Sequence, residues 1–360
     1  MKIAHLINSM HTGGAENLIT ESVPVFKSQG LIVDVILLNG IETPFLAKLQ
    51  ATNCNIVSLS KSSVYNPFLI FKIIPLLKKY DLIHVHLFPA LYWVAIAKLI
   101  SFSNVKLVFT EHSTTNKRRS NCIFRLIDRL VYCSYSKIIT ISEAVDFAIK
   151  KHLRSNNFSF IQIDNGVNLK KIKAGVPYFN GEFVKTKSEM FIFQISSFQY
   201  PKDQKTVIKS LIYLPDDIKL FLVGDGILKL ECEFFAKSLN LEGRVFFLGI
   251  RMDIPDLLKT ADFIVLSSVY EGFSLSCVEG MAAGIPLIAS DVPALRAIVQ
   301  GAGLLFPLGN AKALAENIIK LNSDVDFYQQ TAQSCLQRAS EFDIETMIQK
   351  EIELYKSLLS

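Results

Sequence analysis

Two acidic residues eight positions apart, Glu271 and Glu279, lie around the start of a predicted helix in the segment 267–290 (SSVYEGFSLSCVEGMAAGIPLIAS). An apolar run precedes the segment and a Gly-Ile-Pro turn leads to another, which predicts the order strand, loop, helix, strand. Ser274 is the predicted N-cap. The free N–H groups of residues 272–276 favour a phosphate at this helix start. Glu279 can then reach the ribose hydroxyls of a nucleotide whose diphosphate is bound there.

The same segment resembles the donor site of a known enzyme family. Glu-Gly-Phe, a second Glu, and then Met-Ala-Ala-Gly-Ile-Pro is similar to the motif of the retaining glycosyltransferases of family 4, which have the two-domain GT-B fold. The resemblance implies that Glu279 binds the ribose and that Glu271 lies beside the hydroxyls of the transferred sugar. It also implies that four backbone N–H groups take the diphosphate, those of Gly272, Phe273, Ser274 and Leu275. Taken alone, the motif also fits an ordinary strand-loop-helix unit with two surface acids.

A lysine and two serines follow the predicted strand 190–195. Family members usually have Gly-Arg where this chain has Ser196-Ser197, and a lysine where Lys202 stands. In the family the arginine and the lysine clamp the donor diphosphate and offset the charge that grows on the leaving group. A serine cannot supply a bidentate cation, so Lys202, the helix N–H groups or Lys205 must compensate, or turnover is weakened.

Glycines close the next predicted strands. In Gly224-Asp225-Gly226, the third glycine of a dinucleotide-binding fingerprint would fall at Lys229, which excludes that motif. By resemblance, Gly224 and Gly226 line the nucleotide side of the site, and backbone groups around Ile250 contact the base.

Gly13 and Gly14 separate a predicted first strand, residues 3–7, from a helix over residues 15–29. A turn without Cβ atoms before a helix start lets the backbone approach a phosphate or a sugar closely. By resemblance, this turn faces the donor diphosphate.

Two histidines, His84 and His86, share one face of a predicted buried strand (DLIHVHL, residues 81–87), because side chains alternate along a strand. A zinc site would need further ligands in register, and none is evident in the sequence. Both histidines fit a core or supporting role. His86 is the better candidate for the acceptor pocket because it lies nearer the carboxyl end of the strand.

Thr110-Glu111-His112 ends the next predicted strand. The family commonly has Thr-x-His here, with the histidine beside the transferred sugar. The resemblance therefore implies that His112 is a catalytic residue together with Lys202 and Glu271. Glu111 lies on the acceptor side or serves as a local ion-pair partner.

Five basic residues surround the apolar side of a predicted helix in the segment 116–137 (NKRRSNCIFRLIDRLVYCSYSK). They are Lys117, Arg118, Arg119, Arg125 and Arg129. One interpretation is a solvated basic face over a core helix. The other is a membrane-surface element that meets anionic lipid head groups or a lipid-diphosphate acceptor.

Composition bounds the class of protein. The 360 residues are 50% hydrophobic and 20% charged. This composition supplies enough apolar residues for two hydrophobic cores and excludes global disorder. The six cysteines form no C-x-x-C pair and are typical of a reducing compartment. Residues 1–165 hold 18 basic and 10 acidic residues, a net charge of +8, whereas the rest carries −3, so the first half has an anionic partner. We expect no nucleic-acid partner.

Alternating strands and helices predict an α/β protein with two Rossmann-like parallel-sheet domains that face each other across a cleft, the GT-B arrangement. We expect an N-terminal acceptor domain (1–168), a linker (169–188) and a C-terminal donor domain (189–343). The last helix, 344–360, is expected to pack back on the first domain. We predict no secretory signal and no transmembrane helix, and a cytoplasmic protein that is peripheral on the inner face of the membrane.

By resemblance, the chain is a retaining glycosyltransferase that uses a nucleotide-diphosphate sugar, with UDP favoured, and no metal or other cofactor. Its acceptor is a saccharide, in our prediction a lipid-linked intermediate of cell-envelope polysaccharide (O-antigen or capsule). The alternatives are a catalytically weak nucleotide-sugar-binding protein, for which Ser197 is the argument, and a GT-B sugar-nucleotide epimerase. A phosphorylase of this architecture would need a longer chain and a pyridoxal-phosphate lysine.

Overall fold

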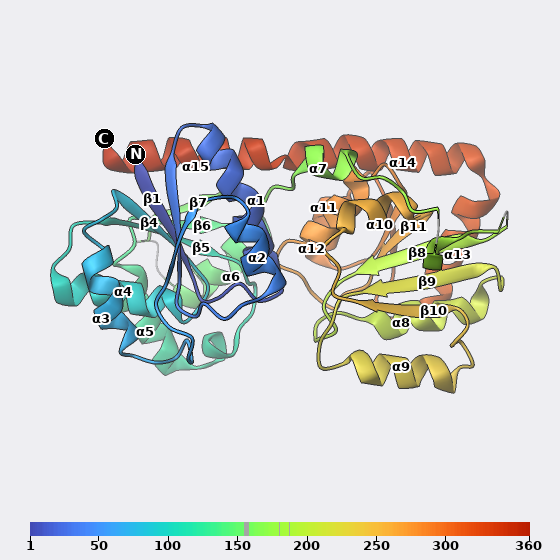
Figure 1. Cartoon of the computed structure of the whole chain (residues 1–360). Helices are drawn as coiled ribbons and strands as arrows, with labels where there is room; N and C mark the ends of the chain where they lie inside the picture. Colours follow the sequence, from blue (N-terminus) through green and yellow to red (C-terminus); the bar gives the residue numbers. More distant parts are fainter. Residues whose placement is uncertain (155–157, 180, 187) are drawn as a thin grey trace. The chain divides into compact units, whose positions relative to one another are not determined.

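The chain forms two compact units. The computed structural model describes residues 1–154, 158–179, 181–186 and 188–360. One unit comprises Met1–Gly166 and Ile344–Ser360, and the other comprises Val167–Asp343 (Figure 1). The terminal helix, which we expected to return to the first domain, thus lies in the first unit.

The first unit contains a parallel sheet whose described strands follow the order β3-β2-β1-β4-β5-β6-β7. The strands are β1 (Lys2–Ile7), β2 (Ile32–Leu37), β3 (Asn55–Ser58), β4 (Leu82–His86), β5 (Lys106–Glu111), β6 (Lys137–Thr140) and β7 (Phe160–Gln162). The order of addition reverses between β1 and β4. Open α/β sheets bind ligands beyond the carboxyl ends of the strands at such a switch point.

Helices cover both faces of this sheet. They are α1 (Gly14–Ser28), α2 (Pro44–Gln50), α3 (Leu69–Ile73), α4 (Ala90–Ser101), α5 (Cys122–Tyr132), α6 (Glu143–Leu153) and α15 (Ile344–Leu359). Ala4 and Leu6 of β1 share a core with α3 and α4. His5, on the opposite face, contacts Phe26 of α1, which stacks on Tyr355 of α15. The histidine face of the sheet is therefore the face under α1 and α15.

The second unit contains a parallel sheet of the order β10-β9-β8-β11-β12-β13. Its strands are β8 (Met190–Ile195), β9 (Ile218–Val223), β10 (Val245–Gly249), β11 (Phe263–Leu266), β12 (Leu287–Ser290) and β13 (Leu304–Phe306). Its helices are α7 (Leu169–Lys173), α8 (Gln204–Ser210), α9 (Lys229–Ser238), α10 (Ile254–Thr260), α11 (Leu275–Ala282), α12 (Pro293–Val299), α13 (Ala311–Ser323) and α14 (Val325–Ala339). The switch point lies between β8 and β11.

The segment 169–188, predicted as an interdomain linker, belongs to the second unit where it is described. Helix α7 packs against α10 and α11, and both Ile172 and Phe183 are buried in the core of that unit. The linker prediction is wrong because these two apolar side chains, spaced among lysines, gain more by burial than a solvated linker could.

One glycine sets how closely α11 approaches the sheet. A Cβ at Gly280 would lie 2.7 Å from Cγ2 of Ile264 in β11, closer than carbon atoms pack. The absence of a side chain there lets α11 pack closely against β11.

Candidate functional site

Two loops meet at the switch point of the second unit. The loop after β8 and the loop after β11 exchange backbone hydrogen bonds: the N–H of Asp203 donates to the Ser267 carbonyl (3.0 Å), and the N–H of Val269 donates to the Pro201 carbonyl (2.9 Å). The Ser267 hydroxyl also donates to Asp203 (2.9 Å). These bonds fix the two loops as one rigid support.

Lys202 and Glu271 form an ion pair on this support, between the Lys202 ammonium and Oε1 of Glu271. The Ser268 hydroxyl donates to the same oxygen (2.7 Å). Only 16% of the Lys202 side chain and 10% of the Glu271 side chain are exposed. A lysine and a glutamate that the sequence places 69 residues apart thus lie together at the switch point.

Helix α11 begins beside this pair. Ser274 is the N-cap, as predicted, and its hydroxyl accepts from the N–H of Cys277 (3.4 Å). The following residue, Leu275, is the first of the helix, and Glu279 is the fifth and is partly buried. Such a helix start presents N–H groups to an anion.

Gly224 and Gly226 border the loop after β8. Their φ angles are +136° and +154°, which residues with side chains rarely adopt. A Cβ on Gly224 would lie 2.2 Å from the Ser196 carbonyl oxygen. The Gly224 N–H donates to the Gly249 carbonyl (2.8 Å), which links this turn to the exposed Ile250. The predicted nucleotide-side residues therefore line one continuous edge of the sheet.

Ser197 and Lys205 lie differently from Lys202. The Ser197 carbonyl accepts from the Gln204 side chain (2.9 Å), so its backbone is held in place while its side chain carries no charge. The Lys205 ammonium pairs with Glu231 on α9 at 2.5 Å. Two lysines were considered as substitutes for the missing arginine. Lys202 pairs with Glu271 beside the start of α11, whereas Lys205 pairs with Glu231 on α9.

Gly13 and Gly14 lie at the switch point of the first unit, where Gly13 is the N-cap of α1 and Gly14 its first residue. Glu16 folds back over them: a Cβ on Gly13 would lie 2.3 Å from its Oε2. Burial raises the pKa of Glu16 to about 7. The loops after β1 and β4 are joined by Asn8, which donates to the Phe88 carbonyl (2.8 Å).

Three histidine rings form a hydrogen-bonded chain on the α1 face of the first sheet. Nδ1 of His5 lies 3.0 Å from Nε2 of His86, and Nδ1 of His86 lies 3.1 Å from Nε2 of His112. His86 is buried with both nitrogens engaged, so it supports His112 in this arrangement. Sequence reasoning missed His5. The signal was available only through the strand order, which pairs His5 of β1 directly with His84 of β4.

His84 belongs to a second, adjacent network. Its Nδ1 lies 2.6 Å from the Tyr355 hydroxyl and its Nε2 lies 2.6 Å from Oγ1 of Thr110. The Tyr355 hydroxyl in turn donates to Glu351 (3.3 Å).

Burial lowers the pKa of each histidine in the two networks. The pKa falls to about 4 for His5 and for His112, and well below the ordinary value for His84 and His86. The cluster is therefore neutral at pH 7.

Glu111 is an internal ion-pair partner. Its Oε2 lies 2.9 Å from Nη2 of Arg119 and accepts from the Tyr132 hydroxyl (2.8 Å), while its Oε1 accepts from the N–H of Ser113 (3.2 Å). Only 5% of the residue is exposed. Of the two roles considered for Glu111, the structure supports the ion pair.

Helix α5 turns its apolar side to solvent. Four large apolar residues are exposed on it: Ile123, Leu126, Ile127 and Leu130. The interpretation as a core helix with a solvated basic face is therefore wrong. None of the helices in the described part of the chain has the length and apolar character that a membrane crossing requires.

Three of the basic residues near α5 turn inward instead: Arg118, Arg119 and Arg129. Arg118 is buried, pairs with Asp128 at 2.5 Å and packs on the Phe88 ring, and the Arg129 side chain donates to the Leu153 carbonyl (2.7 Å). A direct lipid contact by Arg118 or Arg119 is therefore excluded in this structure, because internal carboxylates hold both. The Lys117 side chain lies outside the described part of the chain.

One group of histidines among the described residues is compact enough to be considered as a metal site. Its ring nitrogens belong to His5, His84 and His86 and lie within 4.8 Å of one another. A third ligand to join His84 and His86 was not evident from the sequence, and His5 supplies one. In this structure, however, both nitrogens of His84 and of His86 are engaged in hydrogen bonds.

Solved structures share this fold. HepE from Anabaena, crystallised in complex with UDP and glucose, superposes with a TM-score of 0.86 at 24% identity over 99% of this chain and 100% of that one. A glycosyltransferase from Rickettsia africae gives 0.83 at 20% identity over 100% and 99%. Together with the two parallel-sheet units, these matches establish the GT-B fold.

Curated relatives are sugar transferases or synthases by name. The chain is 28% identical over 263 residues to the N-acetyl-alpha-D-glucosaminyl L-malate synthase of Bacillus anthracis, covering 69% of this chain and 67% of the relative. It is 22% identical over 347 residues to the UDP-Gal:alpha-D-GlcNAc-diphosphoundecaprenol alpha-1,3-galactosyltransferase of Escherichia coli, covering 90% and 88%.

Two family models divide the sequence between them. The model described as Glycosyltransferase Family 4 matches residues 12–171, and the model described as Glycosyl transferases group 1 matches residues 179–338. Together they cover most of both units, including the Gly13-Gly14 turn and the loops that hold Lys202 and Glu271. The chain belongs to the glycosyltransferases of group 1 and family 4.

Proposed function

We propose that the protein is a retaining glycosyltransferase that moves a sugar from a UDP-sugar to a saccharide acceptor, a lipid-linked intermediate of cell-envelope polysaccharide such as O-antigen or capsule. The observation that carries the proposal is the Lys202–Glu271 pair beside the start of α11. It combines a cation and a carboxylate with the N–H groups of a helix start, at the place where an open α/β sheet binds its ligand.

The site residues of the second unit have distinct roles in this proposal. The diphosphate binds to Lys202 and to the N–H groups at the start of α11, and Glu279 accepts from the ribose hydroxyls. Glu271 accepts from hydroxyls of the transferred sugar. Gly224 and Gly226 leave room for the nucleotide, and the backbone at Ile250 contacts the base.

The proposed reaction is a same-face substitution. The acceptor hydroxyl attacks the anomeric carbon while the bond to the β-phosphate oxygen breaks, and the leaving phosphate takes the acceptor proton. Lys202 and the helix N–H groups offset the negative charge that grows on that phosphate, which stabilises the transition state. We propose that this cationic support takes the place of a metal ion.

Names of similar proteins support the choice of donor. The Escherichia coli relative is named for UDP-Gal, and HepE was crystallised with UDP and with UDP-glucose. The test is the thermal shift with UDP, GDP and ADP, because a ligand that binds only the native state raises its melting temperature. We expect a shift with UDP alone. A shift with GDP or ADP instead contradicts the choice of UDP. The absence of a shift with any of the three nucleotides favours a degenerate site that no longer binds the diphosphate because Ser197 stands in place of the arginine.

The lipid-linked acceptor is supported by two observations. The Escherichia coli relative and one from Campylobacter jejuni are named for diphospho-undecaprenol substrates. The apolar side of α5 is exposed on the half of the chain that carries the positive charge. We propose that α5 lies in the membrane interface, as amphipathic helices do, and that it places the first unit near lipid-linked acceptors.

Product analysis separates transfer from the alternatives. After donor class is known, the purified protein is incubated with the UDP-sugar in the presence and absence of a synthetic lipid-diphosphate saccharide. Transfer requires the acceptor and releases UDP. Conversion of the sugar nucleotide without acceptor indicates an epimerase instead, and binding without turnover indicates a nucleotide-sugar-binding protein.

A further inference from the structure

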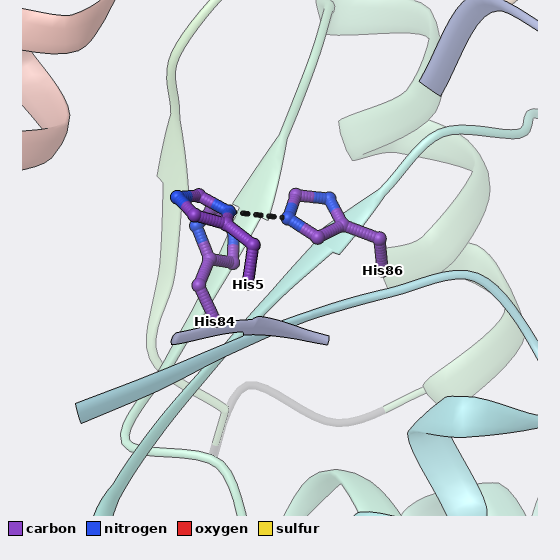
Figure 2. Close-up of side chains that lie close together, drawn as sticks. All are labelled: His5, His84 and His86. Carbon is purple, nitrogen blue, oxygen red and sulfur yellow. Dashed lines mark hydrogen bonds between the residues drawn. The ribbon is translucent and has the colours of Figure 1, made fainter. Parts of the chain in front are cut away.

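The three-ring chain His5–His86–His112 ends at His112, which follows the carboxyl end of β5 at the edge where such a sheet binds its ligand. Figure 2 shows the His5 and His86 rings joined by their hydrogen bond, with His84 next to them. The rings come from three neighbouring strands or their ends, and His5 and His86 are only 2% and 3% exposed. Because the rings are enclosed, the contacts between them determine which nitrogen of each ring carries the proton.

Each of the two nitrogen–nitrogen contacts holds one proton. A neutral imidazole has one N–H and one bare nitrogen, so the middle ring, His86, must donate to one neighbour and accept from the other. The chain therefore has two neutral arrangements. In the first, His5 donates to His86 and His86 donates to His112. In the second, all the donors point the other way.

The far end of the chain distinguishes the two arrangements. Nε2 of His5 is buried and has no hydrogen-bond partner among the described residues. In the first arrangement this atom is a bare nitrogen, and in the second it is an N–H. Unpartnered buried N–H groups are rarer in proteins than unpartnered acceptors, which favours the first arrangement.

We propose that His5 and His86 are positioning residues that hold His112 as the neutral tautomer with its proton on Nδ1, so that His112 donates a hydrogen bond to an oxygen of a saccharide bound at the carboxyl edge of the first sheet. The proposal rests on the proposed function for the saccharide that His112 would contact. In it, His112 is a fixed donor and no general base, because a proton taken at His112 could pass only to His86 and His5. There it would leave a charged ring without a counter-ion.

The low pKa values of the rings agree with this role. Burial holds the pKa of His5 and of His112 at about 4, so the chain keeps its neutral form throughout the physiological range. Neutral rings are required for a role of His5, because a protonated His86 would donate to both neighbours and fix the His112 tautomer without a proton from His5.

The first test reads the tautomer directly. Long-range proton–nitrogen correlation spectra of the full chain labelled with ¹⁵N-histidine distinguish Nδ1–H from Nε2–H in each ring, and single His→Asn variants assign the signals. We expect Nδ1–H for His112, His86 and His5 at pH 7 without any ligand. Nε2–H at His112 overturns the proposal, and so does one equivalent of bound zinc by elemental analysis. Because no substrate is present, this outcome is independent of whether the protein is a transferase.

The second test uses variants of His86, whose Nδ1 lies 3.1 Å from Nε2 of His112. In His86→Asn the amide nitrogen takes about the place of Nδ1 and can still donate, whereas His86→Leu cannot. We expect mixed tautomers at His112 and a loss of about tenfold in kcat/KM in His86→Leu, with both restored in His86→Asn. His152→Asn is the matched control, since His152 is buried in the same unit but pairs with Asp128. An unchanged His112 tautomer in folded His86→Leu overturns the proposal. If His86→Leu does not fold, the wild-type spectrum alone decides.

Discussion

The ammonium of Lys202 and the carboxylate of Glu271 form an ion pair that joins the loop after β8 to the loop after β11. A buried pair serves stability as well as chemistry, because removal of one partner leaves the other charge unpaired. The contribution of the pair to stability can be separated from its contribution to catalysis by comparing a single variant with a double variant.

Lys202→Met should lower kcat/KM by about 100-fold or more, because the leaving phosphate loses its cation. It should also lower the free energy of unfolding by about 3 kcal/mol, because Glu271 is left buried without its partner. The double variant Lys202→Met/Glu271→Gln should regain most of the stability and none of the activity. Urea unfolding and donor kinetics check both.

The matched control is Lys205→Met, which removes a lysine whose pair with Glu231 is largely exposed and is worth less than about 1 kcal/mol. An equal loss of activity in Lys205→Met would place the diphosphate near α8 and contradict the assignment of Lys202.

Glu279→Ala should weaken UDP binding by about 1 to 3 kcal/mol, because charged hydrogen bonds to the ribose are lost. Isothermal titration with UDP measures the change. Glu316→Ala, which removes an exposed acid of α13 in the same unit, is the control and should leave the affinity unchanged. If Glu279→Ala and the wild type bind UDP with equal affinity, the assignment of Glu279 to the ribose is wrong.

Ser197→Arg should tighten donor binding about tenfold, because an arginine fork adds charged hydrogen bonds to a diphosphate. Ser197→Gln is the control for length without charge, and both variants keep the backbone carbonyl that accepts from Gln204. A fall in activity with unchanged folding would mean that this enzyme has rebuilt its clamp around Lys202.

The local motifs were predictable because their geometry is set by residues close in sequence. Ser274 caps α11 because the hydroxyl, the helix start and the preceding strand lie within a few positions of one another. The glycine turns and the alternation of strands and helices follow from equally short-range patterns, which is why both parallel sheets could be expected.

The histidine chain and the orientation of α5 depend on long-range packing. His5 meets His86 because β1 lies beside β4, a strand order that no local pattern encodes. Helical periodicity showed which residues of α5 share a side but not which side faces the protein. The buried Arg118–Asp128 pair decides that, and it pulls the polar side inward.

Glu351→Gln should change how stability depends on pH. Burial raises the pKa of Glu351 to about 8 in the folded protein, from 4.5 in the unfolded chain. The folded state therefore binds the extra proton between these values, and the wild type loses stability as pH rises from 4.5 through 8. At pH 9 the variant should be more stable than the wild type by about 5 kcal/mol, with little difference at pH 4.

Urea unfolding across this pH range tests the prediction. Glu353→Gln, an exposed acid two residues further along α15, is the matched control and should follow the wild-type pH profile. Parallel profiles for Glu351→Gln and the wild type would show that Glu351 is ionised in the folded state.

The apolar side of α5 should bind membranes by insertion. Leu126 and Leu130 are 62% and 67% exposed, so Leu126→Asp/Leu130→Asp should fold normally and lose sedimentation with vesicles that contain phosphatidylglycerol. The wild type should stay bound at about 0.5 M salt, because burial of apolar side chains is not screened as charge attraction is. Phe147→Asp, which changes an equally exposed residue of α6, should bind like the wild type. Release of the wild type by salt would instead assign the binding to basic residues, against the inward turn of Arg118 and Arg119.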